Sequence, residues 1–394
     1  MNSFEKKILE WIERHLYIII AIVVTVMAIV ARCSLSEFVS GDARKFLLPW
    51  YYHIEENGLY SQIGDYNLLY QFMIWLMTRL PIKAIYSYKI LSCAFDFAMA
   101  IIVGFFVHRL SNENKNWNSI IAYSAVLLCP TVFLNSAAWA QCDVIYSAFA
   151  VLGIYLLDRE QYNLSLISLG VSFAFKLHAV FVLPIYLFVY FKKRRFSLLR
   201  FTIVPATMLV LASPLLFWGR NILDTFSIYA SQTKTYPAMA KNYPSAWLLF
   251  CKAEDESQYM LYKTAAIIFT VFMIAVFMVY WIREKYDPSG RSLVIMTFLL
   301  AYTTVLFLPA MHERYGFIYE ILGIILAILI PKTIPLCAGL IAVSLGTYGG
   351  FLCRTDVWPE DLTWTNFILY VAYVVILTRE LKKEQQIAVV PAEQ

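Results

Sequence analysis

Asp42 is the first residue in the chain whose type and surroundings indicate catalysis. It lies about ten residues after the first hydrophobic segment, and the cations Arg44 and Lys45 and the aromatic Trp50 follow it. A carboxylate in such a place can act as a general base that takes the proton from a hydroxyl group. Because a single aspartate in a loop is more often simply solvated, the prediction depends on other polar residues reaching the same face of the protein.

Asp65 and Tyr66 follow in the same outer segment and are candidate substrate-binding residues. Like Asp42, Asp65 is an acid among aromatic residues near the lipid boundary, where a carboxylate can serve as a base. The apolar run 68–80 that comes next is too short to span a bilayer, and its spacing of Tyr70 and Trp75 is typical of a helix lying in the headgroup layer. For Tyr70 and Trp75 we therefore favour a role as interfacial anchors over a chemical role.

Polar residues also enter two later hydrophobic stretches. The first contains Trp139, Gln141 and Asp143. A carboxylate without a partner in such a helix costs roughly 3 kcal/mol on insertion scales, so Asp143 is expected to face a cavity or a cation. The second contains Lys176 and His178, at the turn between two short apolar segments. For Lys176 alone, a side chain that reaches out to the interface is an equally good interpretation.

The run His312-Glu313-Arg314-Tyr315 stands at the head of another apolar segment. The helix dipole opposes cations at a helix N-terminus, so this run predicts an anionic partner there. A phosphate group would fit, because arginine binds phosphate with paired hydrogen bonds.

The composition is that of a polytopic all-α membrane protein. Hydrophobic residues make up 60% of the 394 residues and charged residues only 15%, against about 25% charged in soluble domains. A spanning helix needs roughly 20 apolar residues. About twelve segments are expected to span: 16–31, 86–107, 119–134, 144–157, 164–175, 179–190, 198–217, 260–281, 292–308, 317–330, 334–351 and 366–377. Those between 144 and 190 are short, which indicates tilted or broken helices.

Lysine and arginine in short loops mark the cytoplasmic side. The cluster 192–195 decides the orientation, because inverting the topology would carry four cations across the bilayer. Both termini are then cytoplasmic, and every candidate residue above falls on the extracytoplasmic face. The net charge of +5 reports this topology and gives no reason to expect nucleic acid as a partner.

These residues together resemble the GT-C superfamily of integral-membrane glycosyltransferases. The resemblance rests on Gly41-Asp42 after the first span, Gly64-Asp65-Tyr66-Asn67, Trp139-Ala140-Gln141-Cys142-Asp143, Lys176 with Pro184, and His312-Glu313-Arg314-Tyr315. It covers roughly residues 15–330. Ala140 stands where many bacterial relatives have glycine, and the first loop has a single aspartate in place of an Asp-x-Asp pair.

The resemblance implies an inverting hexosyltransferase of the mannosyl- or glucosyltransferase type. Its donor would be a polyprenyl-phosphate sugar, its partners an acceptor glycan or lipid-linked glycan and the surrounding membrane lipids. Asp42 would be the base, and Lys176, His312 and Arg314 the cations at the phosphate. No cofactor is expected. A divalent metal is not favoured, because one carboxylate is poor coordination and the seven cysteines form no C-x-x-C pair.

The domain organisation predicted is a single polytopic unit over 1–394. A catalytic module covers 1–258, with outer loops 33–85 and 218–258, and C-terminal helices over 259–380 carry the 312–315 run. Two other functions remain open at this point: a flippase or transporter of lipid-linked sugars, whose ionisable groups should lie near the bilayer midplane, and a polysaccharide polymerase or ligase. The sequence does not specify the sugar, the acceptor or the oligomeric state.

Overall fold

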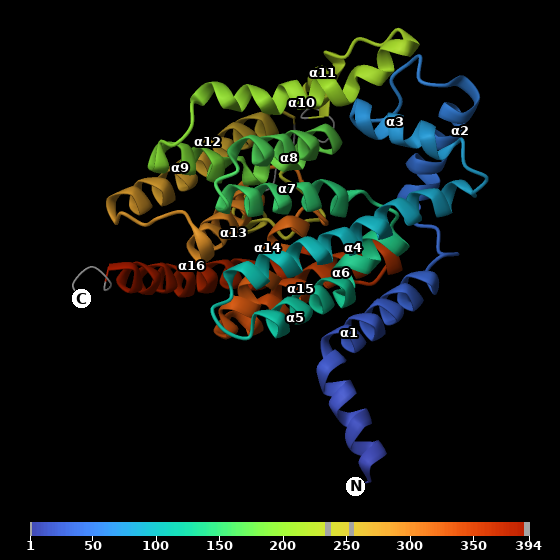
Figure 1. The fold of residues 1–394 in the computed structure, drawn as a ribbon. Coiled ribbons are helices and arrows are strands. Elements are labelled where there is room, and N and C mark those ends of the chain that lie inside the picture. Colours follow the sequence, from blue (N-terminus) through green and yellow to red (C-terminus); the bar gives the residue numbers. More distant parts are fainter. Residues whose placement is uncertain (1, 233–237, 252–255, 390–394) are drawn as a thin grey trace.

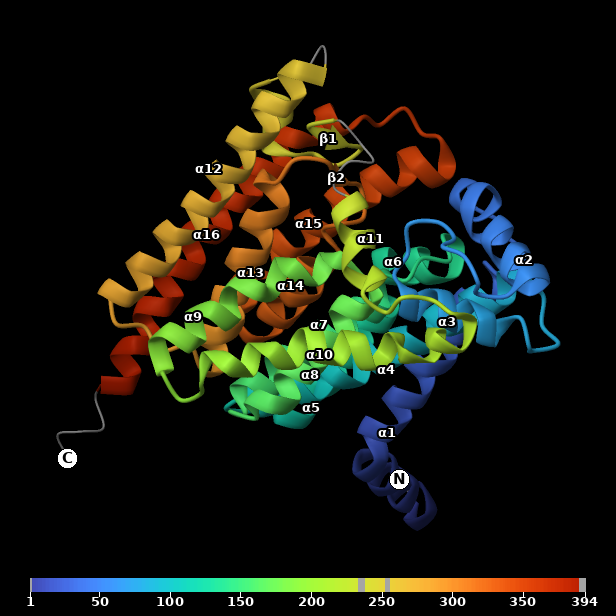
Figure 2. The same ribbon diagram turned by 90° about the horizontal axis from the view of Figure 1, so that it is seen from above.

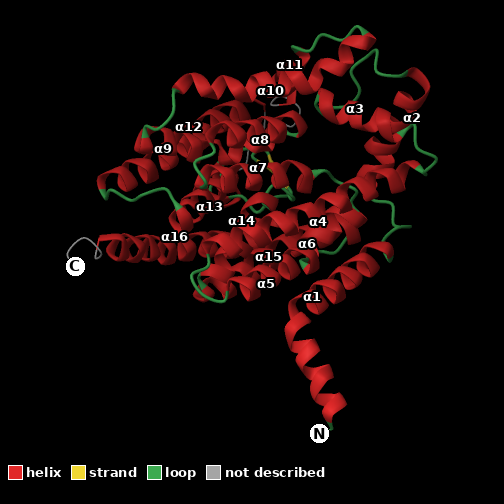
Figure 3. Cartoon of the chain, in the orientation of Figure 1, coloured by secondary structure: helices red, strands yellow, loops and turns green. Residues whose placement is uncertain are grey.

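The computed structural model describes residues 2–232, 238–251 and 256–389. Most of this chain is helical (Figure 3). The chain begins with α1 (Ser3–Cys33), whose N-terminus is closed by a capping box between Asn2 and Glu5. The first part of α1 projects away from the other helices (Figure 1). The elements that follow, up to the next long helix, are η1 (Ala43–Leu47), α2 (Leu48–Asn57) and α3 (Leu68–Met77).

The central part of the chain alternates long and short helices. Its elements are α4 (Ala84–Leu110), α5 (Lys115–Leu128), α6 (Pro130–Phe133), η2 (Leu134–Ala138), α7 (Asp143–Asp158), α8 (Tyr162–Phe175), η3 (Leu177–Val182), α9 (Leu183–Lys193), η4 (Leu198–Thr202), α10 (Ile203–Ala212), η5 (Ser213–Trp218) and α11 (Asp224–Gln232). Helix α4 packs against α5 and α7, and α8 packs against α7 and α10. The chain bends by 46° where α5 meets α6, at Pro130, which lacks the backbone N–H that a continuous helix needs.

The C-terminal part adds four long helices and two very short strands. Its elements are β1 (Ala240–Lys241), η6 (Ala246–Leu249), α12 (Glu256–Arg283), α13 (Gly290–Phe307), β2 (Met311–His312), α14 (Phe317–Leu329), η7 (Pro331–Thr333), α15 (Ile334–Tyr348), η8 (Gly349–Cys353) and α16 (Pro359–Val389). Strands β1 and β2 pair in parallel, with Lys241 opposite His312 (Figure 2). This pairing ties the described part of the loop 218–258 to the 312–315 run.

Seven described helical segments are long and apolar enough to cross a membrane, or eight if α5 and α6 form one bent span. The expected count of about twelve is therefore not confirmed. The other four expected spans correspond to α7, α8, α9 and α14, which have 16 residues or fewer. At 1.5 Å per residue these helices are at most about 24 Å long. Helices α7, α8 and α9 fall between residues 143 and 193, where the short apolar segments indicated tilted or broken helices.

The segment between α1 and α4 differs from its predicted role in one respect. Helix α3 covers most of the run expected to lie in the headgroup layer, but it packs against α4, α8 and α10. Tyr70 is completely buried, with its ring near those of Tyr66, Tyr88 and Phe175. The anchor role predicted for Tyr70 is therefore wrong, because its face of α3 is turned toward the protein. Trp75 is partly buried and packs edge-on against Trp218.

Candidate active site

A cavity of about 800 Å³ opens at one end of the helical body. Ten of the twelve residues singled out in the sequence line it, namely Asp42, Asp65, Tyr66, Gln141, Lys176, His178, His312, Glu313, Arg314 and Tyr315. The remaining two, Trp139 and Asp143, contact residues of its wall. Segments as far apart in the chain as Asp42 and Tyr315 therefore meet in one chamber, as the predicted sidedness requires. The cavity draws on both the 1–258 part of the chain and the C-terminal helices.

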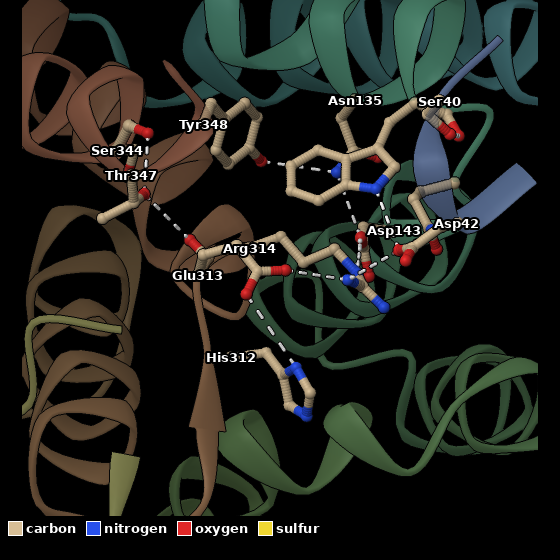
Figure 4. A network of polar contacts seen from close by, with 12 residues as sticks. Ser40, Asp42, Asn135, Asp143, His312, Glu313, Arg314, Ser344, Thr347 and Tyr348 are labelled. Carbon is tan, nitrogen blue, oxygen red and sulfur yellow. Dashed lines mark hydrogen bonds and ion pairs between the residues drawn. The ribbon is translucent and has the colours of Figure 1, made fainter. Parts of the chain in front are cut away.

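The carboxylate of Asp42 is held by two neutral donors. The Nε1 of Trp139 donates to Asp42 Oδ2 at 3.0 Å, and the Nε2 of Gln141 donates to the same oxygen at 3.2 Å. The Nη1 of Arg314 lies 3.6 Å from that oxygen (Figure 4). The side chain of Asp42 remains 18% exposed. All three of these contacts involve Oδ2.

Three π-helical turns surround this carboxylate. Turn η1 begins directly after Asp42, η2 ends directly before Trp139, and η8 carries Phe351, which stacks on the Trp139 ring at 4.6 Å between centroids. Ser40 links the first two, because its Oγ accepts from the backbone N of Ala43 at 3.1 Å and donates to the carbonyl of Trp139 at 3.2 Å. The π-helix is rare and occurs frequently at functional sites.

Ala140 connects Trp139 to Gln141 with a backbone φ of +62°. This is the left-handed region, which costs an L-residue roughly 1–2 kcal/mol and which glycine adopts freely. The turn directs the Trp139 and Gln141 side chains toward the same oxygen of Asp42. Ala140 therefore bears the strain of this turn.

Asp143 begins α7 and is buried, with 1% of its side chain exposed. Lys176 forms an ion pair with its Oδ1, and the Nδ2 of Asn135 donates to its Oδ2 at 3.0 Å. Burial by itself would raise the pKa of Asp143, but Lys176 and Arg314 outweigh it and hold the pKa below its ordinary value. Asp143 therefore has the cationic partner that the sequence predicts, because both Lys176 and Arg314 lie beside it.

Arg314 connects three carboxylates. Its Nε lies 3.2 Å from Asp143 Oδ2 and its Nη1 lies 3.0 Å from Glu313 Oε1, in addition to the approach to Asp42 (Figure 4). Burial disfavours the charge, yet Asp143 and Glu313 hold the pKa of Arg314 well above its ordinary value. Glu313 is buried, and this burial raises its pKa although Arg314 opposes the shift. Arg314 is thus a cation that stays charged at physiological pH.

His312 differs from the expectation that it is a cation, and His178 lies in the same environment. Burial, together with the charges of Arg314 and Lys176, lowers the pKa of His312 to about 3. The same causes, burial first, lower the pKa of His178 well below its ordinary value. Both rings are neutral at pH 7 in the unliganded site. His178 instead packs against Tyr315, with 3.8 Å between the ring centroids, and His312 lies 5.0 Å from that ring.

Tyr66 and Asp65 are adjacent but lie in different environments. The hydroxyl of Tyr66 donates to Gln141 Oε1 at 2.9 Å, which orients the amide so that its nitrogen faces Asp42. Asp65 lines the cavity but is exposed. Its backbone carbonyl accepts a hydrogen bond from Gln232.

The sequence reasoning missed several residues of this site. Asn135 and Tyr348 lie behind Trp139 and Asp143, and Phe46 and Phe351 line the cavity, as does Trp50, which the sequence analysis already named beside Asp42. Asn135 could have been found, because it is a polar residue in the same apolar run as Asp143. Phe351 gives no such signal, because an aromatic residue in an apolar helix is ordinary.

No group of three or more His, Cys, Asp or Glu side chains that could hold a metal ion occurs within residues 2–232, 238–251 and 256–389. The expectation that the reaction needs no metal or other cofactor is untested by this observation and stays a prediction.

The sequence model of glycosyltransferase family 87 matches residues 66–309, more than half of the chain. The chain belongs to this family. The glycosyltransferase is thus an integral-membrane enzyme of the GT-C type, as the resemblance implied. No curated protein matches its sequence. The family match begins at Tyr66 and ends at Pro309, so Asp42, Asp65 and the 312–315 run of this glycosyltransferase lie outside it. Their assignment to the site rests on geometry.

Proposed function

We propose that this glycosyltransferase moves a hexose from a polyprenyl-phosphate sugar to an acceptor hydroxyl, with inversion, on the extracytoplasmic face of the membrane. One observation carries the proposal: the partly exposed carboxylate of Asp42 faces the same cavity as the cations Lys176 and Arg314. A base and a bound positive charge on one cavity are what transfer from a sugar phosphate to a hydroxyl requires.

The proposed step is a single displacement. The acceptor oxygen attacks the anomeric carbon and its proton passes to the carboxylate of Asp42, while the bond from that carbon to the phosphate oxygen breaks and its electron pair stays on the phosphate. Lys176 and Arg314 stabilise the negative charge that develops there. Neutral His312 can donate one further hydrogen bond to the phosphate. Attack from the side opposite the phosphate inverts the anomeric centre.

The proposed sidedness is supported by the charges at the other end of the helical body. Helix α7 begins beside the cavity at Asp143 and ends at Asp158, about 24 Å away at 1.5 Å per residue. Around Asp158 lie Arg109, which pairs with it at 2.7 Å, and the cations Lys193 and Arg291. The side chain of Gln385 bonds to the carbonyl of Glu284, which brings the end of α16 to the turn after α12. Cations in short loops favour the cytoplasm.

The alternatives predict different products. A flippase would move a lipid-linked sugar without cleaving it, and its ionisable groups should lie near the bilayer midplane. Here Asp42 and Lys176 lie at helix ends, and the 312–315 run lies in the two-residue strand β2 and the turn that follows it. A polymerase or ligase would transfer a whole glycan. The identity of the product therefore separates the three functions.

The test uses purified full-length protein in lipid nanodiscs, given labelled polyprenyl-phosphate mannose and polyprenyl-phosphate glucose with a panel of glycan and lipid-linked acceptors. Asp42→Asn should lower transfer by about 10²- to 10⁴-fold, the usual contribution of a general base. Glu56→Gln is the matched control, because Glu56 is an exposed carboxylate on α2 that does not line the cavity. Wild-type rates in Asp42→Asn, or retention of the anomeric configuration, would overturn the mechanism.

A further inference from the structure

Two consecutive residues of α4, Tyr88 and Lys89, contact the segment that carries Asp42 without lining the cavity. Lys89 is 5% exposed, and its Nζ donates to the carbonyls of Leu35, Ser36 and Phe38 at 2.6, 2.9 and 2.6 Å. An ammonium group has three hydrogens to donate. All three are therefore used on the backbone between the end of α1 and Asp42.

The position of Lys89 has a physical reason. The last carbonyls of a helix have no partner within it, and the negative end of the helix dipole favours a cation there. The segment 34–38 continues from α1 as a series of turns, so its carbonyls need donors. A lysine inside an apolar helix is costly unless it is paired. The three carbonyls provide that pairing, and no donor is left over for a substrate.

Tyr88 fixes the other side of the same segment. Its side chain is fully buried, and its hydroxyl donates to the carbonyl of Leu47 at 2.9 Å. Leu47 ends the π-helical turn η1, which starts directly after Asp42. The two neighbouring side chains of α4 therefore hold the backbone four to seven residues before Asp42 and five residues after it.

We propose that Tyr88 and Lys89 are positioning residues, which keep the Asp42 carboxylate at the distance from the acceptor that proton transfer requires. This inference rests on the proposed function of Asp42 as the base. Helix α4 is one of the long helices of the body and packs against α5 and α7, so it is a rigid support. Both residues lie within the part of the chain that matches the family, whereas Asp42 lies outside it.

The experiment compares Lys89→Met, Lys89→Arg and Tyr88→Phe with the control Lys83→Met, since Lys83 is an exposed lysine at the start of the same helix. Lys89→Met should lower kcat by about a hundredfold, the cost of a displacement of about 1 Å at a reacting group. The KM for the polyprenyl-phosphate sugar should stay unchanged, because Lys176 and Arg314 are unaffected. Lys89→Arg should recover most of the rate, because it keeps a charged donor. Tyr88→Phe removes one hydrogen bond and should give a smaller loss of kcat.

Hydrogen exchange provides a measurement that does not depend on activity. Amides in the peptide 34–47 should exchange faster in Lys89→Met and Tyr88→Phe than in wild type, while peptides from α13 and α14 keep their protection. Unchanged exchange in 34–47, or an equal loss of protection throughout the chain, would overturn the positioning role. If the wild-type protein shows no transfer from any donor while exchange in 34–47 responds as expected, the proposed function fails and the contact between α4 and the Asp42 segment stands.

Discussion

The indole nitrogen of Trp139 donates a hydrogen bond of 3.0 Å to Oδ2 of Asp42, a residue 97 positions earlier in the chain. The guanidinium carbon of Arg314 lies 5.5 Å from the centre of the Trp139 ring, and Phe351 stacks on that ring. Trp139 thus holds the proposed base through its edge while its ring contacts the cation proposed to hold the phosphate. The proposed base Asp42 and the proposed phosphate-binding cation Arg314 therefore both contact Trp139.

Trp139→Phe should lower kcat by about 10- to 100-fold and should also lower stability, because it leaves a cavity where a fully buried indole packs. The phenyl ring can keep the stacking with Phe351, but the hydrogen bond to a charged group, worth roughly 1.5–3 kcal/mol, is lost. Steady-state transfer rates measure the effect. Trp364→Phe is the control, because Trp364 is 59% exposed on α16. Unchanged kcat in Trp139→Phe would mean that the hydrogen bond does not matter for catalysis.

Arg314 and Asp143 should show strong coupling in a double-mutant cycle. Removing one partner of a buried ion pair destabilises by about 3–5 kcal/mol, because the other charge is left uncompensated. Arg314→Gln leaves the buried Asp143 with Lys176 alone, and Asp143→Asn leaves two cations facing fewer carboxylates. The double variant should be more stable than the sum of the single effects predicts, by about 0.5–3 kcal/mol. Thermal unfolding of the four proteins measures this, and strict additivity would contradict the coupling.

The convergence of the site was predictable from the sequence because it depends on topology. Asp42, Asp143, Lys176 and Arg314 each stand at an end of an apolar segment, and the positive loops assign those ends to one side. The contacts among these residues pair buried charges. In the sequence, such charges are visible as charged residues within or next to apolar segments.

The supporting contacts were not predictable, for two physical reasons. Lys89 and Tyr88 bind backbone carbonyls, which every residue carries, so their partners leave no trace in the sequence. The short helices α8 and α9 are as apolar as spans, so hydropathy does not reveal that they are shorter than a full span requires. The charge state of His312 could not be predicted from the sequence either. His312 is neutral because of burial and because Arg314 and Lys176 lie nearby in space.

Ala140→Gly should stabilise the protein by about 1 kcal/mol. The alanine has a φ of +62°, where glycine relieves strain by more than it costs in unfolded-chain entropy. Ala301→Gly is the matched control, since Ala301 lies buried inside α13 and glycine there should cost about 1 kcal/mol. Thermal unfolding should show the two variants shifting in opposite directions. A fall in stability for Ala140→Gly would show that the turn is not strained.

Chelation should leave transfer unchanged. The carboxylates of Asp42 and Asp143 already face Arg314, and Asp143 also faces Lys176. A divalent cation would therefore compete with these two positively charged side chains for the carboxylate oxygens. Such ions also require about six oxygen ligands. Rates measured with and without EDTA test this. A loss of activity that magnesium or manganese restores would contradict the prediction and would indicate that Asp42 and Asp65 share a metal.

Stability should fall as the pH is lowered from 7 to 5, and His312 should account for part of the fall. The pKa of His312 is about 3 in the folded protein and about 6.5 in the unfolded chain, so the unfolded state binds the extra proton between these values. The stabilisation is complete above pH 6.5 and is lost as the pH falls toward 3. The slope is at most about 1.4 kcal/mol per pH unit for each such group. His312→Gln should flatten the dependence of the unfolding temperature on pH over this window. The control is His53→Gln, because His53 is exposed on α2. An identical slope in His312→Gln and wild type would mean that His312 is not held neutral by the fold.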